Sequence, residues 1–549
     1  MISIKKYFNT IKYLKPIQIF YRIYYKIIPV FFFVPRHEFV SGIRLTSNNI
    51  MPTCDKDTYF KDGYVYVFGT KVLLPSGVWR FNKQSKLVNY NVNYFDFIHS
   101  SKSCYDKGEE IIQLLTWIDG NNDFSAISWH AYPTSLRIIN WVKFLHGLQN
   151  VHIGILKSLE FQGHWLINNL EYQLLGNHLF VNAKALIFCG YYLSGNDAEK
   201  IKNLGIEILI KELKEQVLDD GASFELSPMY HGIMLEDLLD LFNFISTYTD
   251  DANAPRLLTH LELVILKMFR WLGHMTPPTG RYAHFNDSSG GVAPSYIKLI
   301  EYAERIGIVV PIIDGVSIYF ENSSYACIKN RDALLICDAA KVGPDYIPGH
   351  AHADTLSFEF FLNNKEVFVN SGTSEYGLSN ERLRQRSTSA HNTAVIDDAD
   401  SSEVWGGFRV AKRAVVTDVL FDMNTNYFTA THDGYMRLPC KAIHKREWQL
   451  NEKELIITDT INSFSPCEVE TYFYIHPDII ISQITNNSIS MRDNNNVKIV
   501  EIKFNENVSI FIEATTYHPQ FGKSIPNNRL RFKSQISNSI NMKYIISWN

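Results

Sequence analysis

The sequence predicts an α+β protein with at least two domains, and three observations carry this prediction. The chain has 549 residues, which exceeds the length at which a single hydrophobic core stops growing. Between residues 135 and 306, apolar residues recur at three- and four-residue steps, the period of amphipathic helices. From residue 311 onward, runs rich in Val, Ile, Tyr and Phe alternate with turn-forming residues, which indicates antiparallel strands.

The helical half is expected to consist of helices joined by short turns. Its clearest periodic segments are Leu136–Leu148, Ile153–Leu170, Ile201–Gln216, Met234–Thr247 and Leu257–Leu272. The connectors contain helix-stop and capping residues, as in Ser194-Gly-Asn-Asp197. Helices joined so closely are antiparallel neighbours, and such pairs stack into a bundle, a solenoid or a closed toroid.

The β half is expected to hold many short strands. The clearest are Ala333–Cys337, Glu366–Val369, Glu454–Thr458, Val469–Ile475 and Val508–Glu513. We therefore divide the chain into a mixed N-terminal segment packed on the helices (1–115), a helical domain (116–310) and a β domain (311–549).

Charge and cysteine usage exclude several classes of protein. The 53 basic and 57 acidic residues nearly balance, so bulk charge gives no reason to expect a nucleic-acid partner. The seven cysteines are odd in number, widely separated and never in Cys-x-x-Cys spacing. This usage is typical of reduced thiols, and it indicates neither a disulfide scaffold nor a zinc finger.

The first 36 residues differ from the rest of the chain in charge. No acidic residue occurs before Glu38, whereas basic residues punctuate a run of Ile, Tyr and Phe, namely Lys5, Lys6, Lys12, Lys15, Arg22, Lys26 and Arg36. Such a basic amphipathic segment either lies on an anionic membrane surface or docks as helices on the body of the protein. Of the two, we favour docking.

The start of the chain is a poor secretion signal. Its most apolar stretch, Ile27–Val34, is short, contains Pro29 and is followed by Pro35-Arg36 instead of small residues. No other stretch approaches the ~20 apolar residues of a spanning helix. The expected location is the cytoplasm, with peripheral attachment to the inner membrane as an option and the periplasm as a weaker one.

Residues 349–361 concentrate the polar groups of the β half. If this segment is a strand, its alternation places His350, His352 and Asp354 on one face. The same face then continues into the core with Leu356, Phe358 and Phe360. A rim of this kind suits a metal or a reaction, although two histidines and an aspartate also simply hydrogen-bond one another at sheet edges.

Further motifs give this segment a context. They are Asn370-Ser-Gly-Thr373, Ser387-Thr-Ser-Ala-His391-Asn-Thr393, Asn177-His178 and Ser227-Pro-Met-Tyr230-His231, together with Lys15-Pro-Ile-Gln18, Tyr21-Arg22, Trp79-Arg-Phe-Asn82 and Trp129 to Trp141 in the first third of the chain. Together they resemble the heparinase II/III-like polysaccharide lyase family. The resemblance implies an N-terminal incomplete (α/α) toroid, a C-terminal domain of stacked antiparallel β-sheets, and a cleft between them.

The resemblance also implies a reaction, the β-elimination of a polysaccharide next to a uronic acid. This reaction needs a group that neutralises the uronate carboxylate, one that accepts the C5 proton and one that protonates the leaving oxygen. The matching positions are Asn177 as the neutraliser, Tyr230 as base, acid or both, and His350 as the catalytic partner from the β half. A tyrosine titrates near ~10, so Tyr230 needs a depressed pKa to take a proton near neutrality.

In relatives that hold a structural divalent ion, the metal-binding positions correspond to His352, Asn370 and His391. Asn370 stands where the family has an aspartate, which weakens a zinc or calcium site. A neutral hydrogen-bonded cluster of these residues is an equal alternative, and His350, His352 and Asp354 form a third ligand set. No cofactor is required for the reaction.

Other residues are candidates for binding an acidic chain. They are His178 and His231 beside the catalytic positions, the arginines Arg137, Arg386 and Arg409, and Tyr376 as a lining residue. The loop Tyr282–Asp287 is expected to close one end of the cleft.

Three functions fit these motifs. The first is a lyase acting on a uronic-acid-containing polysaccharide, linked to bacterial capsule or O-antigen metabolism. The second is a uronate C5-epimerase, which begins with the same proton abstraction. The third is a non-catalytic carbohydrate-binding protein of polysaccharide assembly. The oligomeric state does not follow from the sequence.

Overall fold

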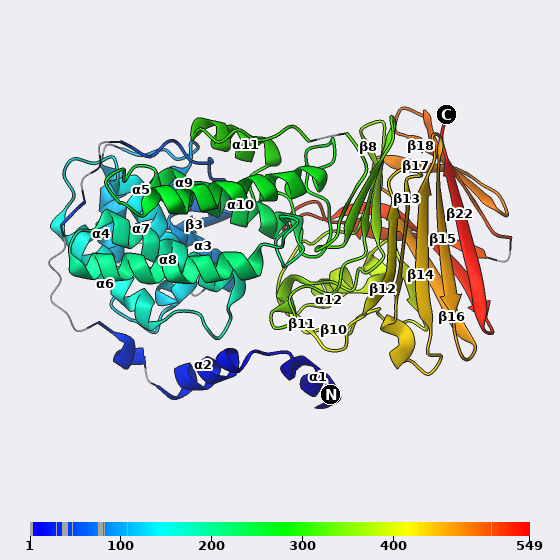
Figure 1. Cartoon of the computed structure of the whole chain (residues 1–549), viewed down its shortest axis with the longest axis horizontal. Coiled ribbons are helices and arrows are strands. Elements are labelled where there is room, and N and C mark those ends of the chain that lie inside the picture. Colours follow the sequence, from blue (N-terminus) through cyan, green and yellow to red (C-terminus); the bar gives the residue numbers. More distant parts are fainter. Residues whose placement is uncertain are drawn as a thin grey trace.

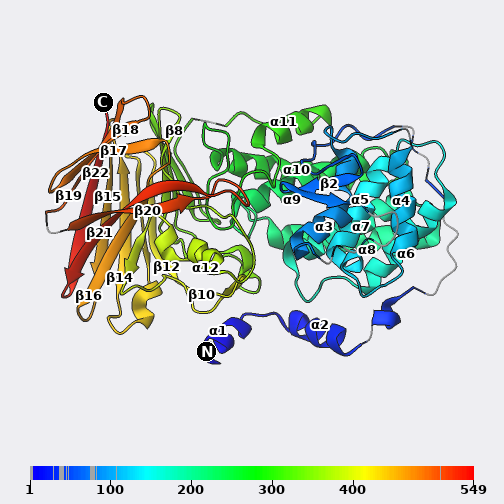
Figure 2. The same cartoon turned by 180° about the vertical axis from the view of Figure 1, so that it is seen from behind.

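The computed structural model describes residues 4–549 except residues 29, 36–41, 45, 47, 75–78, 80, 82, 107, 314 and 507. A helical half and a β half lie side by side, and the N-terminal segment runs beneath both (Figures 1 and 2). The predicted order of helices and strands is confirmed. Of the residues in the sequence motifs, Pro29, Arg36, Arg80 and Asn82 lie outside the described residues.

The helical half is built around α7. Its helices are α3 (Lys86–Tyr94), α4 (Glu109–Gly120), α5 (Ala131–Leu145), α6 (Ile153–Asn168), α7 (Gly176–Tyr192), α8 (Asn196–Gln216), α9 (Pro228–Ile245), α10 (Ala254–His274) and α11 (Tyr296–Arg305), beside a small sheet of β1 (Tyr59–Lys61), β2 (Tyr64–Val67) and β3 (Thr70–Leu73). Nearly every residue of α7 is buried. Its close contact with α8 requires Gly190, because a Cβ there would lie 2.4 Å from the Lys202 backbone nitrogen.

Buried ion pairs connect the two helices that carry the candidate residues. On α7, Lys184 Nζ lies 2.6 Å from both Asp237 Oδ1 and Asp240 Oδ2 of α9. Lys143 of α5 binds the same Asp240 oxygen at 2.5 Å. Buried charges are tolerated only when they are paired in this way, so the cluster fixes α7 against α9.

The β half contains three larger antiparallel sheets. The first joins β4 (Ile318–Phe320), β5 (Tyr325–Lys329), β6 (Ala333–Asp338), β7 (Phe358–Leu362) and β8 (Lys365–Phe368) in that order. The second has the order β12 (Val416–Asp422), β13 (Tyr427–His432), β14 (Ile443–Leu450), β15 (Glu454–Asn462), β22 (Ser539–Ser547), β19 (Lys498–Phe504), β18 (Ser488–Asp493) and β17 (Ile479–Ile484). The third has the order β20 (Ser509–Tyr517), β21 (Ile525–Ile536), β16 (Cys467–Tyr474) and β9 (Ala394–Ile396). Alternating buried and half-buried residues along β14 and β15 show one face turned to the shared core.

The prediction of a strand from residue 349 is wrong. A short 3-10 helix covers Pro348–His350, and β7 begins only at Phe358. Between them the backbone bonds outside the sheet: Asp287 N–H donates to His350 O, and His352 N–H donates to Asn286 Oδ1. Leu356 has φ +63°, which interrupts strand geometry. His350 and His352 therefore do not share a strand face.

The N-terminal segment docks on the body of the protein, as we favoured. It forms α1 (Ile4–Ile11) and α2 (Pro16–Ile27). Gln18 Nε2 donates to the backbone oxygens of Leu174 and Tyr346, and Trp405 Nε1 donates to Thr10 Oγ1 at 3.1 Å. In the described part of the chain, no helix is both long enough and apolar enough to span a bilayer.

Asp287 joins the two halves. Its carboxylate forms a paired contact with the Arg382 guanidinium of α12 (Asn380–Arg386) and accepts a 2.8 Å hydrogen bond from His352 Nε2. Its backbone oxygen accepts a hydrogen bond from Ser227 Oγ, the residue that caps α9. Burial alone would raise the pKa of Asp287, but the Arg382 charge and the His352 hydrogen bond hold it far below its ordinary value.

We expect Asp287→Asn to destabilise the protein by about 3–5 kcal/mol at pH 7, because it leaves the Arg382 charge buried without its partner. A depressed pKa means that the carboxylate stabilises the fold above its unfolded-state pKa of about 4, and that this contribution is lost as the pH falls toward the folded-state pKa. Denaturant unfolding at pH 7 and pH 4 measures both effects: the gap between wild type and variant should narrow at pH 4. The exposed Asp250→Asn is the control, and an equal midpoint for wild type and Asp287→Asn would contradict the prediction.

Candidate active site

The start of α9 positions Tyr230. Ser227 Oγ accepts a hydrogen bond from the Tyr230 backbone nitrogen at 3.2 Å, and Pro228 occupies the first turn, where its missing N–H costs nothing. The Tyr230 side chain then lies at the boundary between the halves. There its ring stacks on His350, with centroids 3.7 Å apart and planes 14° apart, and its hydroxyl lies 2.9 Å from that of Tyr376. The structure thus brings together two residues that the sequence separates by 120 positions.

Glu225 orients His350. His350 Nδ1 lies 2.8 Å from Glu225 Oε2, and the carboxylate is almost fully buried. A carboxylate only accepts here, so Nδ1 carries the proton and Nε2 presents its lone pair. His350 retains 16% side-chain exposure, which leaves it reachable by a substrate. A histidine oriented in this way is suited to accept a proton.

The pKa of Tyr230 is shifted in the direction opposite to the one that a base requires. Burial, the neighbouring Tyr376 and the negative charges of Asp287 and Glu225 all raise the pKa of the Tyr230 hydroxyl well above 10. The expectation that a positive neighbour lowers this pKa is not met in this structure. A tyrosine that keeps its proton suits the role of general acid.

Asn177, in the first turn of α7, lines a small pocket together with Tyr230. The pocket is lined by Tyr132, Asn177, Glu225 and Tyr230 among others, and has a volume of about 20 Å³. Asn177 Oδ1 is buried without a hydrogen-bond partner among the described residues. The unpaired acceptor thus faces a space that holds about one water molecule, and the neighbouring His178 instead pairs with Glu171 at 3.0 Å. Burial alone would lower the pKa of His178, but the Glu171 charge raises it.

Three of the predicted substrate-binding residues are buried and fully engaged in the fold. His231 accepts a hydrogen bond from the Ser223 backbone nitrogen and donates to Met268 O, and burial lowers its pKa to about 3. Arg137 is enclosed by Gln162, the Ser128 carbonyl and the Trp117 ring. Arg386 donates to the carbonyls of Ala351 and Gly406. None of the three reaches a substrate, so those predictions are wrong.

The remaining two candidates differ in position. Tyr376 packs between Phe408 and Phe521 with its hydroxyl on Tyr230, inside the candidate active site. Arg409 is exposed on the underside, above the Trp405 ring and near Tyr7 of the N-terminal segment.

His352 and His391, two of the three predicted metal ligands, lie together, and the third group beside them is Asp354 instead of Asn370. Asp354 joins His352 and His391, and their ligand atoms all lie within 4.8 Å of one another. Asn370 contacts His391 from the side away from His352. Its Oδ1 accepts from the Asn392 backbone N–H, and because an amide oxygen only accepts, His391 Nδ1, 3.2 Å away, donates to it. His352 Nε2 likewise donates to Asp287. The two remaining ring nitrogens face each other at 3.2 Å as lone pairs, so a cation or a proton fits between them.

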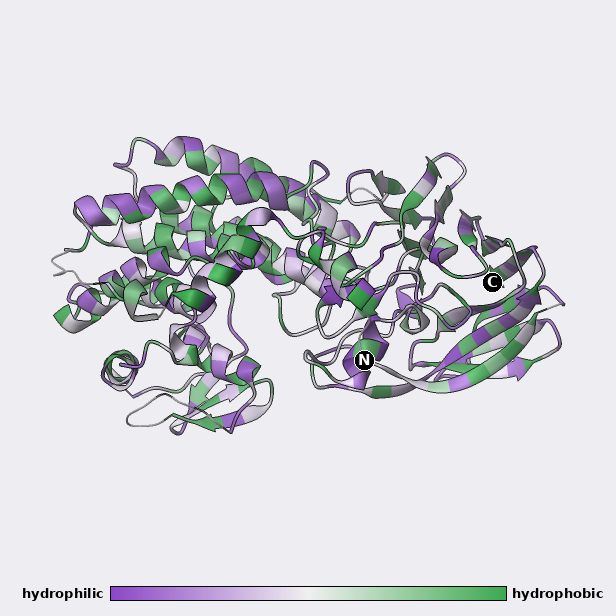
Figure 3. Ribbon diagram, turned by 90° about the horizontal axis from the view of Figure 1, so that it is seen from below, coloured by the Kyte–Doolittle hydropathy of each residue, from purple (hydrophilic) through white to green (hydrophobic). Residues whose placement is uncertain are grey.

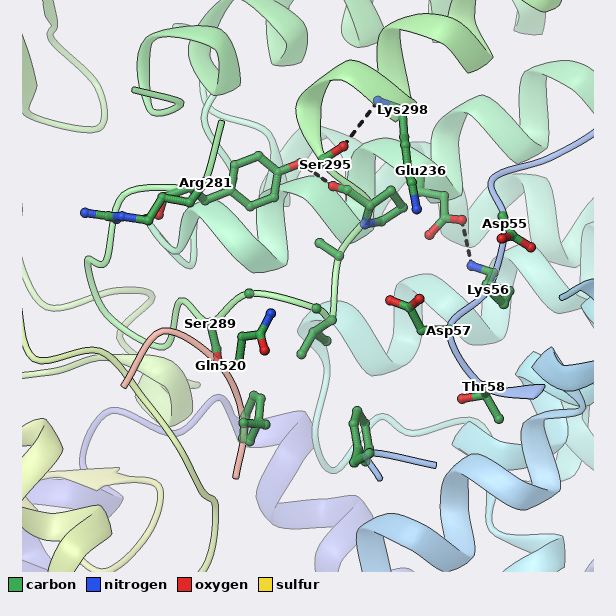
Figure 4. A pocket seen from close by; sticks show the side chains of 18 of the residues that line it. Asp55, Lys56, Asp57, Thr58, Glu236, Arg281, Ser289, Ser295, Lys298 and Gln520 are labelled. Atoms are coloured by element: carbon green, nitrogen blue, oxygen red, sulfur yellow. Dashed lines mark hydrogen bonds and ion pairs between the residues drawn. The ribbon is translucent and has the colours of Figure 1, made fainter. Parts of the chain in front are cut away.

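A separate cavity of about 600 Å³ has none of Asn177, Tyr230, His350 and Tyr376 in its described lining (Figure 4). Phe521 is one of its walls and also packs on the ring of Tyr376, whose hydroxyl lies 2.9 Å from that of Tyr230. Its ionic lining consists of the carboxylates Asp55, Asp57, Asp96 and Glu236 and the cations Lys56, Arg281 and Lys298. Lys56 pairs with Glu236 at 2.6 Å, and Arg281 points away from the cavity toward Glu359 and Glu366. Tyr282 and His284 of the 282–287 loop line the cavity, and Asn286 and Asp287 of the same loop bond His352 of the β half.

Sequence reasoning gave Glu225 no role and did not pair Asp287 with Arg382. Glu225 precedes the Ser-Pro motif by two residues, and an acidic residue so close to a candidate catalytic motif was a signal that the sequence offered. Asp287 and Arg382 are 95 residues apart, and their pairing leaves no mark in local sequence.

Comparison with known proteins agrees with this architecture. The family model for the heparinase II/III N-terminus matches residues 77–304, and the model described as heparinase II/III-like, C-terminal matches residues 314–548. A heparin-sulfate lyase of Bacteroides stercoris is 24% identical over 282 residues, which cover 48% of this chain and 41% of that protein. The corresponding lyase of Bacteroides thetaiotaomicron is 22% identical over 478 residues, covering 72% of this chain and 65% of that protein. This chain thus aligns with less than two thirds of the length of these relatives.

Solved structures show the same fold. A heparinase III structure superposes with a TM-score of 0.66 at 16% identity, covering 89% of this chain and 82% of that one. The heparan sulfate lyase HepC of Pedobacter heparinus superposes with a TM-score of 0.61 at 17% identity, covering 89% and 80%. The expected order of an (α/α) toroid domain and an antiparallel β domain is confirmed by this likeness. Because the two family models together match most of the chain, the protein belongs to the heparinase II/III-like family.

Proposed function

We propose that the protein is a polysaccharide lyase that cleaves beside a uronic acid by β-elimination. The observation that carries this proposal is the contact between Tyr230 and His350 across the two halves, with Glu225 behind the histidine and Asn177 beside the tyrosine. These groups supply the three tasks of the reaction: charge neutralisation, proton removal and proton donation. The relatives named as heparin-sulfate lyases support the same reaction class.

The geometry suggests which residue performs which task. The Asn177 amide donates to the uronate carboxylate and so stabilises charge that develops as the C5–H bond breaks. His350 Nε2 accepts the C5 proton, and Glu225 stabilises the resulting imidazolium. The electron pair forms the C4–C5 double bond, the bond from C4 to the glycosidic oxygen breaks, and Tyr230 protonates that oxygen. Tyr376, hydrogen-bonded to Tyr230, is placed to relay a replacement proton.

We expect Tyr230→Phe and His350→Ala each to lower kcat by about 10²–10⁴-fold, because each removes one proton-transfer group. Glu225→Gln should lower kcat less and leave binding intact. The assay is ultraviolet absorbance of unsaturated ends, with a panel of uronate polymers as substrates and the exposed His260→Ala as control. Solvent deuterium at C5 without unsaturated ends would instead assign an epimerase. Unchanged binding and no turnover in wild type or variants would assign a non-catalytic binding protein.

We further propose that the substrate carries few sulfates. The described cavity lining has four carboxylates against three cations, and two of those cations are already paired. Arg382, which lies near Tyr230, already forms an ion pair with Asp287. A densely sulfated chain would meet a lining without net positive charge, whereas isolated uronate carboxylates need only Asn177 and a few donors.

Among uronate polymers of equal length, the unsulfated ones should therefore show the higher kcat/KM, and heparin the lowest. Asp57→Asn, which removes a carboxylate that points into the cavity, should reduce this preference without changing kcat on the unsulfated polymer. A preference for heparin in the wild type would contradict the charge argument while leaving the lyase proposal intact. The producing bacterium's own capsule or O-antigen, met in the cytoplasm, is our proposed source of such a polymer.

We also propose a structural divalent cation held by His352, His391 and Asp354, for which zinc suits the two imidazoles and one carboxylate. Asp287 and Asn370 would orient the two histidines through their second ring nitrogens. The ion would stabilise the fold of the β half and take no part in the elimination.

Purified protein should then contain about one zinc per chain, and a chelator should lower Tm in the wild type. His391→Ala should contain no zinc, and its Tm should not respond to the chelator. His432→Ala removes another buried histidine outside this cluster and is the matched control, which keeps its zinc. A metal-free wild type whose Tm ignores the chelator would assign these residues to a hydrogen-bonded cluster instead.

A further inference from the structure

The two N-terminal helices are docked with their polar side toward the protein. In α2, Gln18 is buried, Arg22 Nε donates to Gln173 O, and Tyr25 donates to Leu170 O. In α1, Asn9 is buried and Thr10 bonds Trp405. Positions 18, 22 and 25 recur at helical spacing, so one face of α2 makes these contacts. A surface helix ordinarily buries its apolar stripe, and here that orientation is reversed.

The apolar side of the same helices consequently faces solvent. Ile4 is 88% exposed, Phe8 70%, Phe20 59% and Ile27 68%. The outward strip comprises Ile4, Phe8 and Ile11 of α1 and Ile19, Phe20, Ile23, Tyr24 and Ile27 of α2. Bulky residues at helical spacing on two consecutive helices form a continuous apolar surface, which isolated exposed side chains do not.

The charged residues that belong to the strip's own segment have one sign. Lys5, Lys12 and Lys26 are exposed on the two helices or between them, and no acidic residue occurs between positions 1 and 37. A second copy of the chain would bring together two such strips, neither of which carries an acidic residue of its own. An anionic lipid surface instead pairs headgroup charge with the lysines and accepts Phe, Ile and Tyr at the acyl boundary.

We propose that α1 and α2 form a peripheral membrane anchor that lies in the plane of an anionic bilayer while it stays docked on the protein. The arrangement in space fits this role, since the segment runs along the underside of both halves and is not folded into either (Figures 1 and 2), and Figure 3 views the molecule from that side. α1 contacts the β half through Trp405 and α2 contacts the helical half through Leu170 and Leu174, so both halves would be held at the same surface. Docking and membrane attachment, which the sequence offers as alternatives, use opposite faces of the same helices.

The test is vesicle flotation of the full chain at low and high salt. Wild type should float with vesicles of phosphatidylcholine and phosphatidylglycerol (3:1), bind phosphatidylcholine alone at least about tenfold more weakly, and lose binding as salt rises. Phe20→Glu/Ile23→Glu should abolish flotation, and Lys5→Ser/Lys12→Ser/Lys26→Ser should weaken it at least about tenfold. The matched control is Phe464→Glu, which changes an exposed phenylalanine of the β half and should float like wild type.

A second measurement needs no substitution. Hydrogen exchange of the wild type should slow in residues 4–27 when phosphatidylglycerol vesicles are added, and should stay unchanged in β14 and β15. Each variant should have the same Tm as the wild type and should turn over a soluble polymer at the same rate. Wild type that stays unbound to anionic vesicles, or that binds both vesicle types equally, would overturn the proposal. So would a dimer in solution that Phe20→Glu/Ile23→Glu converts to monomer, since the strip would then be covered by a second copy.

Discussion

The buried carboxylate of Asp287 is the interaction on which the rest of the site depends. It is held by the Arg382 guanidinium and His352, while its backbone bonds Ser227 on one side and His350 on the other. Ser227 caps the helix that carries Tyr230, and His350 is the ring stacked on Tyr230. One residue therefore sets the distance between two groups from different halves. A buried ion pair contributes little net stability, but it is favourable only at well-defined distances and angles. It therefore fixes the relative positions of the two halves at this boundary.

The same boundary prepares two neighbouring rings for opposite roles. Glu225 fixes the tautomer of His350 and would stabilise its protonated form, whereas burial and the carboxylates of Asp287 and Glu225 keep the Tyr230 hydroxyl protonated. Negative charge beside a histidine favours a base, and negative charge beside a tyrosine favours an acid. The same carboxylates thus support both roles, whereas sequence reasoning had required a positive neighbour that lowers the pKa of Tyr230.

The sequence predicted the helices and strands whose positions depend on the local pattern of apolar residues. The period of apolar residues located α6 from Ile153 and β15 from Glu454 at their observed first residues, whereas α9 begins at Pro228, before the predicted start at Met234. Arg137 and His231 looked available because arginine and histidine are usually exposed, yet both are enclosed by partners far along the chain, such as Gln162 and Met268. Such partners, like the pair of Asp287 and Arg382, arise from tertiary packing, which no spacing in the sequence encodes.

The failure of the strand prediction at residue 349 explains how two histidines two residues apart serve different ends. A true strand would have turned His350 and His352 to one face, and both would have met the same neighbours. The 3-10 turn at Pro348–His350 and the bonds from Asn286 and Asp287 replace the sheet ladder. His350 thereby turns toward Glu225 and Tyr230, while His352 turns toward Asp287 and His391. Leaving the strand is thus what separates the proposed reaction centre from the proposed cation site, with Asp287 bonded to both segments.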